Sequence, residues 1–168
     1  MNFGCRAMRT AVILVVVVLA LLCRPAVSEE WTTFEEPNFG TRLEVPTETF
    51  SVHEGPSYRG IGEQYTTEDG RAALAVYSQQ NRRNDTPRTY LKRNNLVSPR
   101  MIDYVRVTRS FFAISAAKEG MIFYSRCNFS CSSGTIHCFD LKYPAGEKPA
   151  WDAIVTRLSR SLEPLERG

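Results

Sequence analysis

The stretch MIFYSRCNFSCSSGTIHCFDLKY, residues 121–143, contains two runs of aromatic and β-branched side chains on either side of a small polar tip. Two such runs around a Ser/Gly-rich tip are typical of antiparallel strands joined by a turn. If Ser132 and Ser133 form the centre of that turn, Cys127 and Cys138 are equally far from it along the two strands. The sequence therefore predicts a long hairpin in which Cys127 lies directly opposite Cys138.

This hairpin carries three of the five cysteines of the chain. Opposed positions on antiparallel strands lie about 4.5–5.5 Å apart at Cα, which is within the range that a disulfide accepts. We therefore favour a disulfide between Cys127 and Cys138, with Cys131 left as a spare thiol near the tip. The alternative pairing, Cys131 with Cys138, needs a wider loop, which Gly134 permits.

The hairpin also offers the residue types of two reactive sites. Its cysteines and His137 are ligands that zinc accepts, but structural zinc sites draw ligands from separate knuckles, and these crowd one hairpin. His137, Asp140 and a nearby serine are the components of a hydrolytic triad, but the chain has no Gly-x-Ser-x-Gly turn to present a nucleophile. We interpret His137 as an ordinary sheet residue and predict no catalytic, cofactor-binding or metal-binding residues.

Downstream of the hairpin, the sequence predicts an amphipathic helix that begins at Pro149 and ends before Pro164. Its apolar residues recur at helical spacing: Trp151, Ile154, Val155, Leu158 and Leu162. This spacing puts one apolar stripe on the helix, which is typical of a helix packed on a sheet.

Upstream, the pattern predicts further strands and a middle helix. Residues 103–115 are expected to form a strand that turns at Glu119-Gly120 into the hairpin. Residues 61–66 and 71–78 flank the turn pair Asp69-Gly70, and the second arm is apolar on both faces, as in a central strand. Thr86 and Pro87 are typical of a helix start, and Pro99 indicates that this helix has ended.

The N-terminal part carries weaker patterns. Residues 29–40 are expected to be an aromatic-punctuated segment whose acidic pairs Glu29-Glu30 and Glu35-Glu36 are solvated. A short strand is expected at residues 41–45, followed by a loop over residues 46–60. Gly60-Ile61-Gly62 lacks the third glycine of a dinucleotide-binding loop and is interpreted as a turn. These elements together predict an α+β fold, an antiparallel sheet packed by a middle helix and a C-terminal amphipathic helix.

The order of elements, and the sequences of the last strands and of the final helix from Trp151 to Leu162, resemble the PsbP-like α/β sandwich family. The stretches YSRCNF at residues 124–129, IHCF at 136–139 and WDAIVTR at 151–157 also resemble small exported proteins of alphaproteobacteria. The resemblance implies a single-domain sandwich with a closing helix on the sheet. It transfers no site residue, because this fold hosts unrelated binding and assembly roles.

Residues 1–28 are typical of a cleavable signal peptide: Arg6 and Arg9, an apolar run over residues 11–22, and small residues before Glu29. A membrane-spanning helix usually needs about 18 apolar residues, which this run does not reach. A lipoprotein at Cys23 is disfavoured because Leu22 precedes it. We therefore predict cleavage between Ser28 and Glu29 and a single globular domain over residues 29–168.

Loss of the leader changes the charge of the protein. Arg6, Arg9 and Arg24 leave with it, so the 21 basic residues fall to 18, which equals the 18 acidic ones. A neutral domain with scattered charges does not favour nucleic acid as a partner. We expect a monomer in the periplasm or secreted, with no permanent membrane anchor.

The leading functional hypothesis is a non-enzymatic binding or accessory domain for another protein or a cell-envelope component. The basic cluster Arg82, Arg83 and Arg88 is a candidate contact for an anionic partner. The alternative is a small hydrolase or thiol/redox protein that uses the Cys127–Cys138 hairpin, with His137 or Cys131 as a reactive residue.

Overall fold

The computed structural model describes residues 29–94, 101–130 and 134–165, and the structural statements below concern these residues. The predicted signal peptide at residues 1–28, including the cleavage site after Ser28, lies outside them. So do Cys131, the tip residues Ser132 and Ser133, and Pro99.

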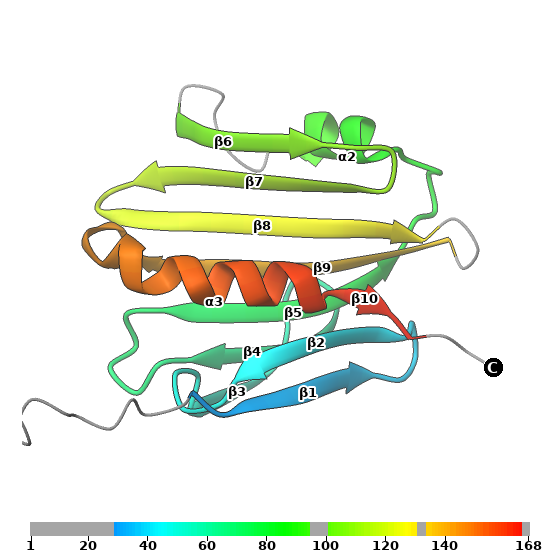
Figure 1. Ribbon diagram of the computed structural model, residues 1–168. Helices are drawn as coiled ribbons and strands as arrows, with labels where there is room; N and C mark the ends of the chain where they lie inside the picture. The colour runs from blue at the N-terminus through cyan, green and yellow to red at the C-terminus, as the bar shows by residue number, and fades with distance from the viewer. Residues whose placement is uncertain (1–28, 95–100, 131–133, 166–168) are drawn as a thin grey trace, which may run out of the picture.

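A seven-stranded antiparallel sheet forms the centre of the molecule, with strand order β3-β4-β5-β9-β8-β7-β6 (Figure 1). Its strands are β3 (Val52–Pro56), β4 (Ile61–Thr66), β5 (Ala73–Gln80), β6 (Ile102–Val107), β7 (Phe111–Lys118), β8 (Met121–Ser130) and β9 (Thr135–Pro144). β5 lies between β4 and β9, and its middle residues are buried on both faces, as the sequence predicts. β8 and β9 form the predicted hairpin, in which Cys127 is the cross-strand partner of Cys138.

A second layer covers one face of this sheet, called the front face here because it is the one seen in Figure 1. The layer consists of a small sheet of β1 (Trp31–Glu36), β2 (Thr41–Pro46) and β10 (Glu163–Pro164), together with α3 (Lys148–Ser161) beside β2. A 3-10 turn, Ala145–Glu147, leads from β9 into α3. The larger core fills the space between the layers and includes Leu43, Leu74, Phe139, Trp151 and Leu158. Each such side chain contributes about 1.5–3 kcal/mol when it is fully buried.

The opposite face of the large sheet, the back face, carries the middle helix α2 (Pro87–Asn94). Thr86 caps this helix, because its Oγ1 accepts a hydrogen bond from the amide of Thr89 at 3.2 Å. Tyr90 of α2 stacks on Phe112 with ring centroids 5.9 Å apart. A second, smaller core forms here. No helix among the described residues is long and apolar enough to cross a membrane.

The α+β class and the two helices are thus confirmed, and three strands correct the sequence interpretation. The segment at residues 29–40 contains β1, residues 46–60 contain β3, and β6 is a strand separate from β7. β1 and β3 show no regular apolar alternation that a sequence pattern could detect. They are strands because their backbones pair with one neighbour each, β1 with β2 and β3 with β4. The acidic pairs were expected in solvent, but Glu36 is only 4% exposed.

Candidate functional site

Among the described residues, the helix α2 covers one end of the back face of the large sheet. α2 packs over the end that contains Tyr77 and the Cys127–Cys138 pair. Two further cross-strand rows lie beyond it, next to Asn94 at the end of α2. The first row is Gln64, Ala75, Asp140, Ser125 and Ile114, and the second is Thr66, Ala73, Lys142, Phe123 and Ala116. A cavity of about 400 Å³ lies over these rows, and this region is called the open half of the back face.

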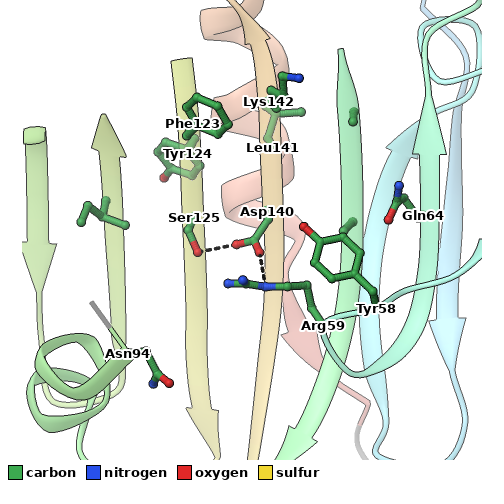
Figure 2. A pocket seen from close by; sticks show the side chains of 13 residues that line it. Tyr58, Arg59, Gln64, Asn94, Phe123, Tyr124, Ser125, Asp140, Leu141 and Lys142 are labelled. Carbon is green, nitrogen blue, oxygen red and sulfur yellow. Dashed lines mark hydrogen bonds and ion pairs between the residues drawn. The ribbon is translucent and has the colours of Figure 1, made fainter. Parts of the chain in front are cut away.

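Asp140 is the centre of the polar groups in this cavity (Figure 2). Its Oδ1 accepts a hydrogen bond from the Ser125 hydroxyl at 2.5 Å. Its Oδ2 lies 3.1 Å from Nε of Arg59 and accepts a hydrogen bond from the Tyr77 hydroxyl at 3.2 Å. Three donors from three different elements therefore converge on one carboxylate in the middle of β9.

Burial raises the pKa of Asp140, and the hydrogen bond from Ser125 and the charge of Arg59 act in the opposite direction. The side chain is 25% exposed, so the carboxylate has lost much of its hydration. A carboxylate in this setting is stable when a cation and hydrogen-bond donors replace the lost water. With its oxygens occupied by these donors, Asp140 is suited to fix the shape and polarity of the cavity rather than to accept a proton from a substrate.

The chain positions Arg59 by a tight turn between β3 and β4. Ser57 is buried and donates its amide hydrogen to the carbonyl of Gly62 at 2.9 Å, while its hydroxyl accepts the amide hydrogen of Arg59 at 3.2 Å. Gly60 and Gly62 let this turn lie against β5: a Cβ on Gly62 would be 2.1 Å from the Val76 carbonyl oxygen. Of the predicted turn Gly60-Ile61-Gly62, Gly60 lies in the turn, whereas Ile61 and Gly62 already belong to β4. Both glycines are needed because the backbone approaches β5 closely.

The rim of the cavity is partly apolar and carries a cation. Tyr58, next to Arg59, is 80% exposed, and Phe123 is 39% exposed. Both line the cavity together with Lys142, which forms no ion pair within the described part of the chain (Figure 2). Apolar walls with a few convergent polar groups are the usual composition of a ligand-binding or anchor pocket.

The structure separates His137 from Asp140. Side chains alternate between faces along a strand, so these residues, three positions apart on β9, point to opposite faces of the sheet. His137 is 1% exposed on the front face, with its Nδ1 2.6 Å from the Thr41 hydroxyl. The triad components that the sequence offered are therefore not assembled.

His137 is part of a buried chain of polar groups, and its burial determines the protonation state of the imidazole. The Thr41 hydroxyl contacts that of Ser78, which in turn lies 3.5 Å from the carboxylate of Glu36. The Nε2 atom of His137 is buried and has no hydrogen-bond partner among the described residues. Burial lowers the pKa of His137 to about 4, and the Glu36 carboxylate offsets only part of that shift. The imidazole is therefore neutral at physiological pH.

Cys127 and Cys138 lie at disulfide distance, with sulfur atoms 2.03 Å and Cα atoms 4.2 Å apart. Both point to the back face under α2, away from His137. Among the described residues, no three His, Cys, Asp or Glu side chains are grouped to hold a metal ion. Arg82, Arg83 and Arg88, the basic cluster, are exposed around the start of α2.

Sequence reasoning considered Asp140 only as a triad member and missed Arg59 and Ser125. A signal was present: an acidic residue within the apolar run IHCFDLKY, residues 136–143, requires a partner if the strand is buried. The partner lies far away in sequence, so only the fold identifies Arg59.

Comparison with solved structures bears on the fold. No protein-family profile and no curated protein matches the sequence. The solution structure of PsbP (CyanoP) from Synechocystis sp. PCC 6803 matches with a TM-score of 0.58 at 9% identity, covering 84% of this chain and 96% of that chain. The chain has the PsbP-like sandwich fold.

The same fold is found in a second solved structure. The Ran-binding protein Mog1p from Saccharomyces cerevisiae matches with a TM-score of 0.51 at 12% identity, covering 83% of this chain and 97% of that chain. The fold that the sequence resemblance implied is thus confirmed. At these identities the likeness concerns the fold, and function has to be argued from this chain's own residues.

Proposed function

We propose that this chain is an exported, non-enzymatic accessory domain that binds another protein of the cell envelope through the open half of its back face. In this proposal the leader at residues 1–28 is removed after Ser28, and residues 29–168 act as one monomeric domain in the periplasm or outside the cell. The observation that carries the proposal is the cavity around Asp140, whose carboxylate is already paired and whose rim is partly apolar and carries the Lys142 cation.

The composition of the rim favours a protein as the occupant. Tyr58 and Phe123 stand beside the cavity and offer aromatic surface of the kind that is enriched in protein interfaces. A single apolar side chain of a partner fits between them, over Ala75 and Ile114 at the base. Lys142 at the rim favours a carboxylate next to that anchor residue in the partner.

Three further observations support binding over catalysis. The donors around Asp140 come from β5, β8 and the turn before β4, and they satisfy its oxygens without any substrate. His137, the only histidine on the hairpin, is buried on the other face. One structural neighbour, Mog1p, is itself a Ran-binding protein, so a protein-binding role is compatible with the fold.

Site-specific photocrosslinking in the cells that produce the protein tests this proposal. A photoreactive phenylalanine analogue replaces Phe123 or Tyr58 on the open half, and Ile61 or Thr156 in control variants. Ile61 is 47% exposed and points to the front face, and Thr156 is exposed on α3, which covers that face. We expect one adduct of the same mass from Phe123 and Tyr58, absent from the controls and lost when Lys142→Glu is added. Equal adducts from both faces, or none from the open half, would overturn the proposal.

A further inference from the structure

A second feature lies along β6, which forms an edge of the large sheet. Within the described residues, β6 pairs with β7 and with no other strand. Its four middle residues are exposed, including Tyr104 at 46% and Val105 at 52%. An edge strand presents unpaired backbone N–H and C=O groups, which an extended peptide can pair with.

The two faces of β6 differ in chemistry. Tyr104 and Arg106 point to the front face, and Val105 points to the back face beside Ile114. A register irregularity between Ile102 and Tyr104 disturbs the start of the strand and leaves residues 104–107 regularly paired. A strand added to this edge would therefore alternate between a cationic front and an apolar back.

The cationic front is a cluster of two arginines on one aromatic ring. Arg106, Ala113 and Arg126 form one cross-strand row over β6, β7 and β8. The guanidinium carbons of Arg106 and Arg126 lie 5.5 and 4.3 Å from the centroid of the Phe111 ring. Each contact is a cation–π interaction. We call Arg106, Arg126 and Phe111 the arginine cluster.

The arginine cluster lacks a counter-charge. Neither arginine forms an ion pair with a carboxylate in the part of the chain that the structure describes. Arg126 is half-buried, and its Nε donates to the side-chain oxygen of Asn128 at 3.1 Å. Burial lowers the pKa of Arg126, and the charge of Arg106 acts in the same direction. An anion placed between the two guanidinium groups would relieve both effects.

We propose that β6 is a docking edge for an extended acidic segment of a partner protein, which pairs with Tyr104–Val107 as an added strand. Carboxylates at alternate positions of that segment face the arginine cluster, and apolar side chains at the intervening positions contact Val105. A free phosphate would satisfy the charge but would use neither the backbone edge nor Val105. Val105 lies beside Ile114, which also lines the cavity around Asp140, but the arginine cluster lies on the opposite face of the sheet. Substitutions in the arginine cluster therefore test this proposal without changing the open half of the back face.

The test uses the processed protein, residues 29–168, and synthetic peptides at low ionic strength. The probe is an acetylated, fluorescein-labelled peptide SEVEVESG, with the permuted peptide SEEEVVSG and the basic peptide SKVKVKSG as controls. Binding is measured by fluorescence anisotropy and by chemical-shift changes of backbone amides. We expect the alternating acidic peptide to bind at least fivefold more tightly than the permuted one, with shifts concentrated at residues 104–107, and the basic peptide not to bind.

Matched variants assign the effect to the arginine cluster. Arg106→Gln, at an exposed position, is expected to weaken binding at least fivefold, whereas Arg83→Gln in the loop before α2 leaves it unchanged. Arg126→Gln is expected to weaken it further, in a sample whose amide spectrum shows an intact fold.

Three outcomes would overturn the proposal. They are equal binding of the alternating and permuted peptides, equal loss in Arg83→Gln, and complete displacement by inorganic phosphate at the concentration of the peptide.

Discussion

The Arg59 guanidinium lies 3.1 Å from the Asp140 carboxylate and thereby joins the turn before β4 to the middle of β9. The same guanidinium carbon lies 5.9 Å from the centroid of the Tyr77 ring, whose hydroxyl also donates to Asp140. The pair fixes one wall of the cavity and supplies the positive charge that the partly buried carboxylate needs. We therefore expect this ion pair to contribute more to the stability of the fold than a solvent-exposed ion pair does.

Replacing Arg59 is expected to leave the Asp140 carboxylate without its cation. Arg59→Met should lower the free energy of unfolding by about 2 kcal/mol, between the values typical of exposed and of fully buried pairs. Urea denaturation at pH 7 measures this change. Arg71→Met, which removes exposed ion pairs with Asp69 and Glu147, is the control and should cost less than about 1 kcal/mol.

A second substitution distinguishes the charge from the packing of Arg59. Asp140→Asn in the Arg59→Met background removes the uncompensated charge and should recover part of the lost stability. Equal stability losses in Arg59→Met and Arg71→Met, with no recovery by Asp140→Asn, would show that the ion pair does not carry this role.

Stability is expected to depend on pH through His137. The folded protein lowers the pKa of this imidazole to about 4, whereas an unfolded chain protonates it below about 6.5. Between these values the unfolded state binds more protons, so stability is complete above pH 6.5 and falls as the pH falls toward 4. The full contribution is about 3 kcal/mol.

Urea denaturation from pH 7 to pH 4 measures this dependence. His137→Gln is expected to be less stable at pH 7, because the contact with Thr41 changes, but to show a flatter pH profile. A variant profile parallel to that of the unchanged protein would assign the acid sensitivity to other groups.

Sequence patterns predicted those elements that are defined by the local spacing of their residues. The apolar stripe of α3, the cap at Thr86 and the hairpin that places Cys127 opposite Cys138 depend on local spacing, and the structure has all three. β1 and β3 were missed because they are edge strands whose exposed side chains carry no regular alternation. Backbone pairing to a neighbouring strand defines them, and a sequence pattern does not contain that information.

The candidate site was less accessible to sequence reasoning. Its four groups, Arg59, Tyr77, Ser125 and Asp140, come from four separate segments of the chain. Burial of Glu36 was missed for a similar reason, because the fold places its carboxylate 3.5 Å from the hydroxyl of Ser78, 42 residues away in sequence. Polar clusters of this kind depend on tertiary contacts between distant segments.

Gly62 is expected to tolerate no side chain. A Cβ there would lie 2.1 Å from the Val76 carbonyl oxygen, so Gly62→Ala should push β4 from β5 and cost about 2 kcal/mol or more. Thermal unfolding measures the loss. Gly146→Ala, where a Cβ meets no atom within 4 Å, is the control and should change stability little. If the two variants have the same melting temperature, β4 and β5 do not approach each other this closely in solution.

The cysteine pair is expected to be oxidised if the protein is exported as proposed, with Cys131 as a free thiol. Free thiols are alkylated and the protein is digested without reduction by chymotrypsin, which cleaves after Phe129, between Cys127 and Cys131. Mass spectrometry should recover the peptide that contains Cys127 linked to the peptide that contains Cys138, with Cys131 alkylated. The closed loop spans 11 positions, so Cys127→Ser should lower stability by about 2–3 kcal/mol. Recovery of a Cys131–Cys138 link instead would restore the alternative pairing.

The same experiment tests the predicted processing. The N-terminal peptide of the mature protein should begin at Glu29. An N-terminus at Met1, or a lipid on Cys23, would contradict the proposed cleavage between Ser28 and Glu29.

The affinity for the partner captured at Phe123 is the measurement that tests the central claim most directly. Isothermal titration calorimetry with that purified partner compares Phe123→Asp on the open half of the back face with Ile61→Asp on the front face. We predict at least a tenfold weaker Kd for Phe123→Asp and a change of less than about twofold for Ile61→Asp, because a charge would enter the apolar rim in the first variant only. Equal affinities for the two variants would show that the open half of the back face is not the binding surface.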